Sequence, residues 1–325
     1  MIDRFLSCDW GTSSFRLRLV EVNSFKIIAE ESSKEGSAAT YERWQQANAP
    51  EETRYAFYLS IIKEHLKKLE QQLNSSLNNI PLVISGMASS SIGMLELPYK
   101  DFPFSIDGSD LQTKVIDEST DFKHLTILIS GAKTDDDVMR GEEVQLAGSG
   151  FPHTADEQLF LHAGTHSKHV VVKNGQAISL KTYMTGEFFS LLSGKSILSA
   201  SVQNGGSVSE KNNLKAFELG AKAGFVGNLL HEAFMIRTNN LMEKISKVEN
   251  WFYLSGLLIG TELKAFPGSF SGAIILAGEP ILTDLYSKAL TCLGISQKVS
   301  SVQIKAADEI TLKGQFEVFR RMKDL

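Results

Sequence analysis

A strand-turn-strand pattern that occurs twice constrains this chain more strongly than any other feature. The first copy, Phe5–Val20, is an apolar run ending at Asp9, then a Gly-Thr-Ser-Ser turn, then alternating apolar and polar residues. The second copy, Leu159–Val172, has the same layout around Gly164 and lies almost half of the 325-residue chain further on. Such repetition indicates an internal duplication, so we expect two similar halves with a ligand-binding cleft between them.

The first turn carries residue types that bind phosphate. Gly11 lets a ligand approach the backbone closely, and the hydroxyls of Thr12 and Ser13, with the neighbouring amides, can donate to phosphate oxygens. Asp9, at the end of the first strand, offers the oxygen ligands that Mg²⁺ prefers when it bridges nucleotide phosphates. An ordinary polar hairpin is the competing interpretation of this copy alone. The second copy favours phosphate binding.

The composition is typical of a globular protein with room for two cores. Hydrophobic residues make up 42% of the chain and charged residues 22%, and the net charge is −5. An acidic chain lacks the basic surface that nucleic-acid binding requires. We also expect no membrane partner, a cytoplasmic location, and free thiols at Cys8 and Cys292, because we find neither a long apolar run nor a signal-peptide pattern. A homodimer is left open.

Hydrophobic periodicity predicts an α/β fold. Expected strands outside the two hairpins are Lys26–Glu30, Pro81–Ser85, Leu125–Ile129, Phe252–Leu254 and Ala273–Leu276, and all but the first end in glycine turns. Expected helices are Glu51–Leu73, Asp135–Gly148, Asn213–Met235, Pro280–Leu293 and Gly314–Leu325, while Glu35–Ala39 is expected to be a loop. Buried strands that end in glycine turns are typical of a sheet with ligands beyond the carboxyl ends of its strands.

Five further segments occur in the order found in one enzyme family. They are Gly86–Tyr99, Asp137–Glu143, Gly164–Lys168, Met184–Glu187 and Leu254–Leu263. Together they resemble the 2-dehydro-3-deoxygalactonokinase family, and Asp9–Arg16 resembles the first phosphate motif of its sugar kinase, heat-shock chaperone and actin superfamily. The resemblance implies a two-domain actin-like ATPase (ribonuclease H-like) fold with a central cleft. We place the domains at residues 1–131 and 132–325.

The resemblance also implies a reaction, the ATP-dependent phosphorylation of 2-dehydro-3-deoxy-D-galactonate at its 6-hydroxyl, with ATP and Mg²⁺ as cofactors. Asp9 falls on the magnesium position and Glu142 on the position of the base that accepts the hydroxyl proton. Asp137 and Glu143 remain rivals for the base. Asp135 and Asp136 are expected to cap the helix that follows.

The binding residues that the resemblance implies form two groups. The nucleotide group is Gly11, Thr12, Ser13, Arg16, Gly164, Thr165, Ser167, Lys168, Gly256 and Gly278. The acceptor group is Ser37, Ala38, Gly86, Met87, Glu96, Tyr99 and Arg140. Plain turns are the competing interpretation of Gly256 and Gly278. A zinc site of His162, His166 and His169 is disfavoured, because a strand places the third side chain on the opposite face.

The segment Gly86–Tyr99 departs from the family pattern at the place where a substrate carboxylate would bind. It has Ser91, Ile92 and Met94 where the family leads us to expect an Arg-Gln pair and a Trp. Serine cannot replace the bidentate charge of arginine. We therefore expect Arg140 or Lys100 to bind the carboxylate. The alternatives are a kinase of the same fold for another sugar or sugar acid, and a non-catalytic ATP-binding sensor.

Overall fold

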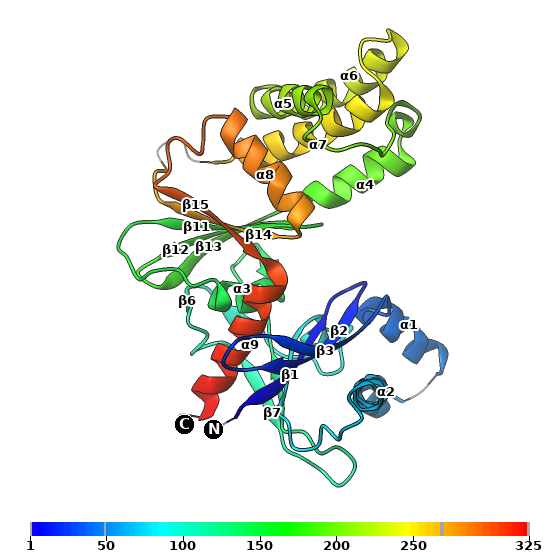
Figure 1. Ribbon diagram of the computed structural model, residues 1–325, viewed down its shortest axis with the longest axis vertical. Helices are drawn as coiled ribbons and strands as arrows, with labels where there is room; N and C mark the ends of the chain where they lie inside the picture. Colours follow the sequence, from blue (N-terminus) through cyan, green and yellow to red (C-terminus); the bar gives the residue numbers. More distant parts are fainter. Residues whose placement is uncertain (1, 49, 267–269, 324–325) are drawn as a thin grey trace. The chain divides into compact units, whose positions relative to one another are not determined.

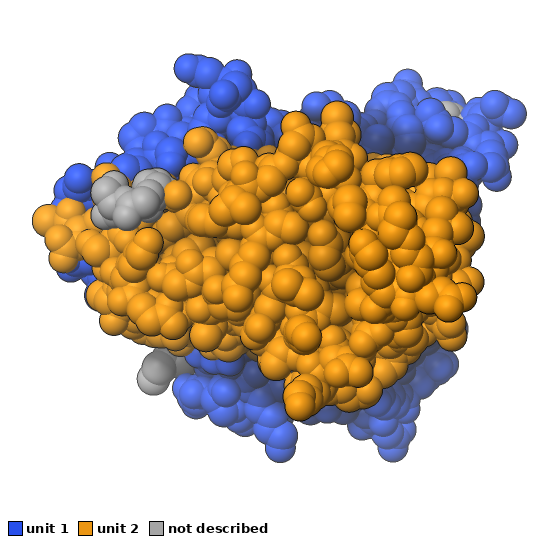
Figure 2. Space-filling model, turned by 90° about the horizontal axis from the view of Figure 1, so that it is seen from above, with its two compact units in different colours: residues 1–154, 172–180, 307–325 blue, residues 155–171, 181–306 orange. Residues whose placement is uncertain are grey.

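The chain forms two compact units, which we describe separately. The computed structural model describes residues 2–48, 50–266 and 270–323. Unit 1 comprises residues 1–154, 172–180 and 307–325, and unit 2 comprises residues 155–171 and 181–306 (Figure 2). None of the described helices combines the length and apolar character needed to cross a bilayer.

Unit 1 is built on a six-stranded sheet with the order β3-β2-β1-β4-β8-β7. The strands are β1 (Arg4–Trp10), β2 (Phe15–Glu21), β3 (Ile27–Ser33), β4 (Leu82–Gly86), β7 (Thr113–Ile116) and β8 (Thr126–Ile129). β1, β2 and β3 are antiparallel, whereas β4 and β8 run parallel to β1. The expected first hairpin and the three strands that follow it in unit 1 are thus confirmed. The parallel strands bring Asp9 and Gly86 to the same edge of the sheet.

Helices cover both faces of this sheet (Figure 1). On one face, α2 (Arg54–Leu73) packs on β3 and places Tyr58 against Trp10, and α1 (Ser37–Gln46) and the short η1 (Glu51–Thr53) contact α2. On the other face lies α9 (Ala307–Lys323), whose Gln315 amide donates to the Cys8 carbonyl and the Ser85 hydroxyl. The prediction of a loop at Glu35–Ala39 is wrong in its second half, because α1 begins at Ser37.

The short helix α3 (Glu142–Gly148) packs on α9 at two glycines. A Cβ on Gly148 would lie 1.9 Å from the Ile310 carbonyl oxygen, and one on Gly314 would lie 1.8 Å from the Val144 carbonyl oxygen. Residues 132–154 and the C-terminal helix, which pack together in this way, belong to unit 1. We expected a domain boundary between residues 131 and 132. The C-terminal helix also begins earlier than expected, at Ala307 rather than Gly314.

The helix expected over Asp135–Gly148 is wrong in its first half. A three-stranded sheet of order β10-β9-β5 occupies this region, with β5 (Lys100–Asp101), β9 (Ala132–Lys133) and β10 (Val138–Met139). The Thr134 hydroxyl accepts hydrogen bonds from the amides of Asp136 and Asp137 and thereby forms the turn between β9 and β10. Asp135 and Asp136 therefore belong to this turn and do not cap α3.

A second six-stranded sheet has the order β15-β14-β11-β12-β13-β6. Its strands are β6 (Phe104–Ser105), β11 (Gln158–Ala163), β12 (Ser167–Lys173), β13 (Gln176–Tyr183), β14 (Ala273–Gly278) and β15 (Ser301–Ala306). β14 runs parallel to both β11 and β15. The order β13-β12-β11-β14-β15 repeats the order β3-β2-β1-β4-β8 of the first sheet. The expected duplication is thus confirmed.

The helices of unit 2 gather on one side of this sheet (Figure 1). They are α4 (Thr185–Lys195), η3 (Ile197–Ser201), α5 (Lys211–Val226), α6 (Leu229–Leu241), α7 (Lys247–Leu263) and α8 (Pro280–Cys292). The helix expected over Asn213–Met235 is two helices, α5 and α6, that meet near Gly227. Pro280 occupies the first turn of α8, where its missing amide hydrogen costs nothing.

The strand expected at Phe252–Leu254 is wrong, because these residues lie within α7. This helix is buried on nearly all sides, so its sequence is apolar all round and resembles a core strand. A Cβ on Gly256 would lie 2.1 Å from the Phe217 carbonyl oxygen of α5. Gly256 therefore permits close packing of two helices and does not belong to a glycine turn.

Candidate active site

Asp9 lies at the end of β1, directly opposite Arg16 on β2. Arg16 Nη1 is 3.5 Å from Asp9 Oδ2, and the Asp9 side chain remains 26% exposed. Burial raises the pKa of Asp9, the charges of Arg16 and Arg18 lower it, and those of Asp308 and Glu142 raise it again. Asp9 is therefore a carboxylate that a ligand can reach, at the centre of a group of charged side chains.

Asp308, in the first turn of α9, joins this group although sequence reasoning did not identify it. Its Oδ1 is 3.6 Å from Arg16 Nη1, and its Oδ2 accepts a hydrogen bond of 2.7 Å from Arg18 Nη2. Arg18 is 2% exposed and also pairs with Glu30 on β3. An acid in the first turn of an amphipathic helix was the only sequence signal, and helix capping explains it equally well.

Two glycines bring α3 next to Asp9. Gly86 has a φ of +86°, and a Cβ there would lie 2.7 Å from the Trp10 carbonyl oxygen and 3.5 Å from Asp9 Oδ1. Gly141 has a φ of +108°, and a Cβ there would lie 3.7 Å from the Gly86 Cα. Both glycines have backbone conformations that other residues rarely adopt. The end of β4 and the start of α3 can therefore lie together beside the Asp9 carboxylate.

Glu142 is the first residue of α3 and is half-buried beside this carboxylate. Its Oε2 accepts a hydrogen bond of 3.0 Å from the Arg140 amide, and its charge raises the pKa of Asp9. The positions of Gly86 and Gly141 thus place Glu142 near the edge of the sheet where Asp9 lies.

The two rivals for the base lie in different surroundings. Glu143 has no exposed surface, and both of its carboxylate oxygens accept from the Gly141 amide, at 2.9 and 2.8 Å. Burial, and then the charge of Glu142, raise the pKa of Glu143 from 4.5 to about 8. Asp137 lies in the turn between β9 and β10, where its Oδ1 accepts from the Val138 amide at 2.7 Å. Of the three carboxylates, Glu142 is the one whose charge acts on Asp9.

The start of α1 contacts the tip of the first hairpin. The Ser37 amide donates to the Gly11 carbonyl at 2.9 Å, and the Ala38 amide donates to the Thr12 carbonyl at 3.1 Å. Thr12 and Ser13 are exposed, so their hydroxyls are accessible to a ligand. The structure thus brings two residues predicted for the acceptor next to three predicted for phosphate.

Arg140 is held between two neighbours in the segment that follows β4. Its Nη1 donates to the Ser89 carbonyl at 2.7 Å, and its guanidinium carbon lies 4.2 Å from the centre of the Tyr99 ring. Met87 begins the short helix η2 (Met87–Ser89). Glu96 is exposed, and within the described ranges no hydrogen bond or ion pair joins it to this group. Lys100 pairs with Asp110 at 3.2 Å.

The tip of the second hairpin lies against the start of α4. A Cβ on Gly186 would lie 2.7 Å from the Gly164 carbonyl oxygen, and the Glu187 amide donates to the Thr165 carbonyl at 3.1 Å. Thr165 is exposed, whereas Ser167 and Lys168 are buried. The Ser167 hydroxyl is hydrogen-bonded to the Tyr286 hydroxyl at 2.8 Å. Gly164 and Thr165 are therefore accessible to a phosphate, and the Ser167 hydroxyl is already engaged.

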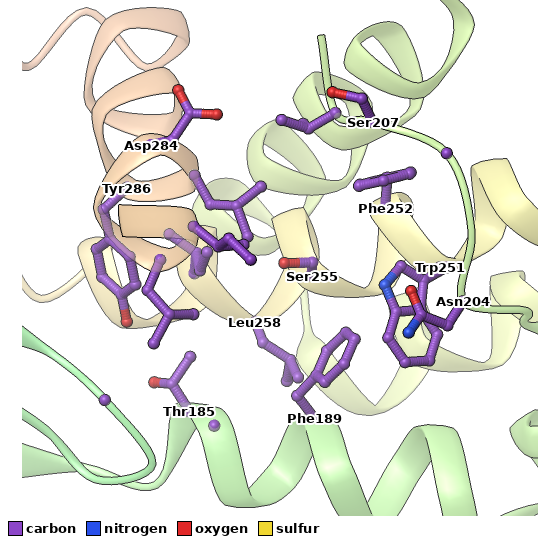
Figure 3. Close-up of a pocket in the computed structure, with 18 residues that line it drawn as sticks. Thr185, Phe189, Asn204, Ser207, Trp251, Phe252, Ser255, Leu258, Asp284 and Tyr286 are labelled. Carbon is purple, nitrogen blue, oxygen red and sulfur yellow. The ribbon is translucent and has the colours of Figure 1, made fainter. Parts of the chain in front are cut away.

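A pocket of about 510 Å³ extends from this hairpin tip across unit 2 (Figure 3). Its walls are mostly apolar and aromatic, with a few polar groups, and the labelled lining residues are Thr185, Phe189, Asn204, Ser207, Trp251, Phe252, Ser255, Leu258, Asp284 and Tyr286. This size and lining are typical of small-molecule sites. Gly164 lies at its edge, and Gly278 ends β14 beside Ala163. Gly256 is not among the lining residues, since it faces α5.

Two histidines of the second hairpin have carboxylate partners. His166 Nε2 is 2.5 Å from Glu187 Oε2, and His169 Nε2 is 2.8 Å from Glu262 Oε1. Within the part of the chain that the structure describes, no group of three or more His, Cys, Asp or Glu side chains is arranged to hold a metal ion. Cys8 and Cys292 are free thiols, as expected.

Comparisons with known proteins match this chain to one enzyme family. The sequence profile of the 2-keto-3-deoxy-galactonokinase family matches residues 9–318. A Rhizobium meliloti (strain 1021) protein assigned as a 2-dehydro-3-deoxygalactonokinase is 29% identical over 319 residues, which cover 95% of this chain and 94% of the relative. The 2-dehydro-3-deoxygalactonokinase of Escherichia coli (strain K12) is 32% identical over 222 residues, covering 66% of this chain and 71% of the relative.

The fold comparison points to the same family. The crystal structure of a Sinorhizobium meliloti protein assigned as a 2-dehydro-3-deoxygalactonokinase superposes with a TM-score of 0.79 at 26% identity. The match covers 99% of this chain and 100% of that protein. Because the family profile spans nearly the whole sequence, this chain belongs to the 2-keto-3-deoxy-galactonokinase family.

Proposed function

We propose that this protein transfers the γ-phosphoryl group of ATP to the 6-hydroxyl of 2-dehydro-3-deoxy-D-galactonate, giving 2-dehydro-3-deoxy-6-phosphogalactonate and ADP. The observation that carries the proposal is the cluster of Asp9 and Glu142, which Gly86 and Gly141 bring together in a chain of this family. These two carboxylates suit two roles in phosphoryl transfer to a hydroxyl, holding the metal and accepting the acceptor proton.

Asp9 would hold the magnesium ion. Its carboxylate lies at the carboxyl end of a strand, is partly exposed, and is next to a turn rich in hydroxyls, which suits a hard cation that keeps several water ligands. When bound, Mg²⁺ neutralises charge on the phosphates during transfer. Burial raises the pKa of Asp9, and the charge of Arg16, 3.5 Å from Asp9 Oδ2, opposes this effect.

Glu142 would accept the proton of the acceptor hydroxyl. The hydrogen bond from the Arg140 amide to Oε2 helps to fix the direction of its carboxylate. A positioned base of this kind contributes about 10²- to 10⁴-fold to the rate.

The nucleotide would be divided between the two hairpin tips and the pocket of unit 2. We assign the phosphates to Thr12, Ser13, Gly164 and Thr165, and the adenosine to the pocket between α4, α7 and α8. The aromatic side chains of Trp251 and Phe252 offer flat apolar surface for a base. A location in the cytoplasm completes this proposal.

The acceptor carboxylate would bind Arg140. Lys100, the other cation considered, is paired with Asp110, whereas the hydrogen bonds of the Arg140 Nη1 atom are to neutral groups of Ser89. An arginine stacked on an aromatic ring and unpaired with any carboxylate among its described contacts can receive a substrate carboxylate.

The departure at Ser91 favours one second candidate, a kinase of the same fold for a neutral sugar. Release of ADP, coupled to a spectrophotometric assay, separates the two over a panel of 2-keto-3-deoxy sugar acids, aldonates and neutral sugars. We expect the highest kcat/KM with 2-dehydro-3-deoxy-D-galactonate. A higher kcat/KM with a neutral sugar would establish the second candidate instead.

A further inference from the structure

A buried carboxylate, Glu262 of α7, lies behind the wall of the unit 2 pocket. The residue is 3% exposed. Its Oε1 is 2.8 Å from His169 Nε2, and its Oε2 accepts hydrogen bonds from the hydroxyls of Tyr286 and Thr185. The steps proposed above do not use this group.

Each partner of Glu262 comes from a different element around the pocket. His169 lies on β12, Thr185 begins α4, and Tyr286 lies on α8. Thr185 and Tyr286 both line the pocket, and Figure 3 shows them at the same end of it. The Tyr286 hydroxyl also contacts Ser167, which follows the tip of the second hairpin. Glu262 thus connects the pocket wall to the hairpin through hydrogen bonds.

The arrangement of donors indicates a role beyond packing. A buried carboxylate costs free energy unless donors surround it, and a buried charged network is often no more stabilising than apolar residues of the same shape. Such a network does fix the positions of its members. Burial and the Glu262 charge also hold the pKa of Tyr286 well above its ordinary value, so this hydroxyl stays a donor.

We propose that Glu262 is a positioning residue for nucleotide binding: it fixes the Thr185 and Tyr286 side chains that form one end of the pocket. This inference rests on the proposed assignment of that pocket to the nucleotide of the kinase reaction. Every partner of Glu262 named here lies in unit 2, whereas the residues proposed for the acceptor lie in unit 1. Loss of the carboxylate should therefore weaken ATP binding and leave acceptor binding unchanged.

The test compares full-length Glu262→Gln with the unsubstituted protein. Initial rates give KM for ATP and for the sugar acid, and calorimetry gives Kd for a non-hydrolysable ATP analogue with Mg²⁺. We expect KM for ATP and Kd to rise about tenfold or more, the usual effect of losing hydrogen bonds to a charged group, with the acceptor KM within twofold. Glu232→Gln is the matched control, because Glu232 contacts the Tyr253 hydroxyl on another part of α7.

Two further variants keep the test decisive if Glu262→Gln does not fold. Thr185→Ala and Tyr286→Phe each remove one donor, and each should raise Kd for the analogue without changing the acceptor KM. Unchanged Kd in the folded variants would overturn the positioning role and leave the proposed function intact. If the unsubstituted protein does not bind the analogue, the assignment of the nucleotide pocket is wrong, and the inference falls with it.

Discussion

Arg16 and Asp308, which are far apart in the sequence, form an ion pair of 3.6 Å directly beside Asp9. Because Arg16 also lies 3.5 Å from Asp9, the two carboxylates share one guanidinium. Asp308 therefore limits how strongly Arg16 can pair with Asp9, and a metal ion bound at Asp9, as proposed, would compete with Arg16 for the same carboxylate.

The substitution Asp308→Asn should remove this ion pair and strengthen the pairing of Arg16 with Asp9. The Mg²⁺ concentration for half-maximal rate is expected to rise about two- to fivefold. This change corresponds to the free energy of a partly exposed ion pair. Glu309→Gln is the matched control, because Glu309 is the next residue and pairs with Lys313 on the helix surface. Identical Mg²⁺ dependence in Asp308→Asn and the control would contradict the competition.

Glu142→Gln should lower kcat by about 10²- to 10⁴-fold, because the variant cannot accept the acceptor proton. The KM for ATP should change little, since the proposed nucleotide contacts do not include Glu142. Asp137→Asn is the control, and we expect near-normal turnover because Asp137 lies in the turn between β9 and β10. The opposite pattern of the two variants would show that the base has been misassigned.

Glu143 should make the stability of the protein depend on pH. Its pKa is raised from 4.5 to about 8, so the folded protein binds a proton that the unfolded chain has lost. The stabilisation from this group is complete below pH 4.5 and is lost between pH 4.5 and about 8, by up to about 1.4 kcal/mol per pH unit.

Glu143→Gln removes this proton linkage. Denaturant midpoints at pH 5, 6.5 and 8 should therefore fall less steeply with pH in the variant than in the unsubstituted protein. Glu118→Gln, at an exposed position of unit 1, is the control for the loss of one carboxylate. Parallel pH dependence in Glu143→Gln and the unsubstituted protein would mean that the buried carboxyl is not protonated at neutral pH.

Arg140→Ala should raise the acceptor KM about tenfold or more while the KM for ATP stays nearly constant, because a charge-assisted pair with the substrate carboxylate is lost. Arg140→Lys keeps the charge but loses the planar guanidinium group. Its acceptor KM should therefore lie between those of Arg140→Ala and the unsubstituted protein. Ser91→Arg should tighten acceptor binding or leave it unchanged. A larger effect of Lys100→Ala on the acceptor KM would assign the carboxylate to Lys100.

The parts of the fold that depend on local patterns were predictable from the sequence. Both hairpins, the glycine-terminated strands β4, β8 and β14, and the helix α2 follow from alternation or from helical spacing over short stretches. The α/β class and the duplication are confirmed because the two sheets repeat one strand order. The family that the ordered motifs implied is confirmed by the family profile.

The sequence predictions that were wrong or incomplete failed because of tertiary structure. α7 resembles a strand in sequence because it is buried on nearly all sides, and Gly256 within it serves helix packing. Gly141, which has a positive φ, directly precedes α3. Hydrophobic periodicity does not reveal that the helix begins there. Asp308 and Glu262 could not be recognised from the sequence, since each acts through side chains that the fold brings from distant strands or helices.

The most direct test of the account is the identity of the product. After incubation with ATP, Mg²⁺ and 2-dehydro-3-deoxy-D-galactonate, phosphorus and proton NMR should show one phosphate monoester at C6 for each ADP released. Folded Asp9→Asn, checked by circular dichroism, should form almost none of this product. Release of ADP without the phosphorylated sugar acid, or equally efficient phosphorylation of neutral sugars, would contradict the account.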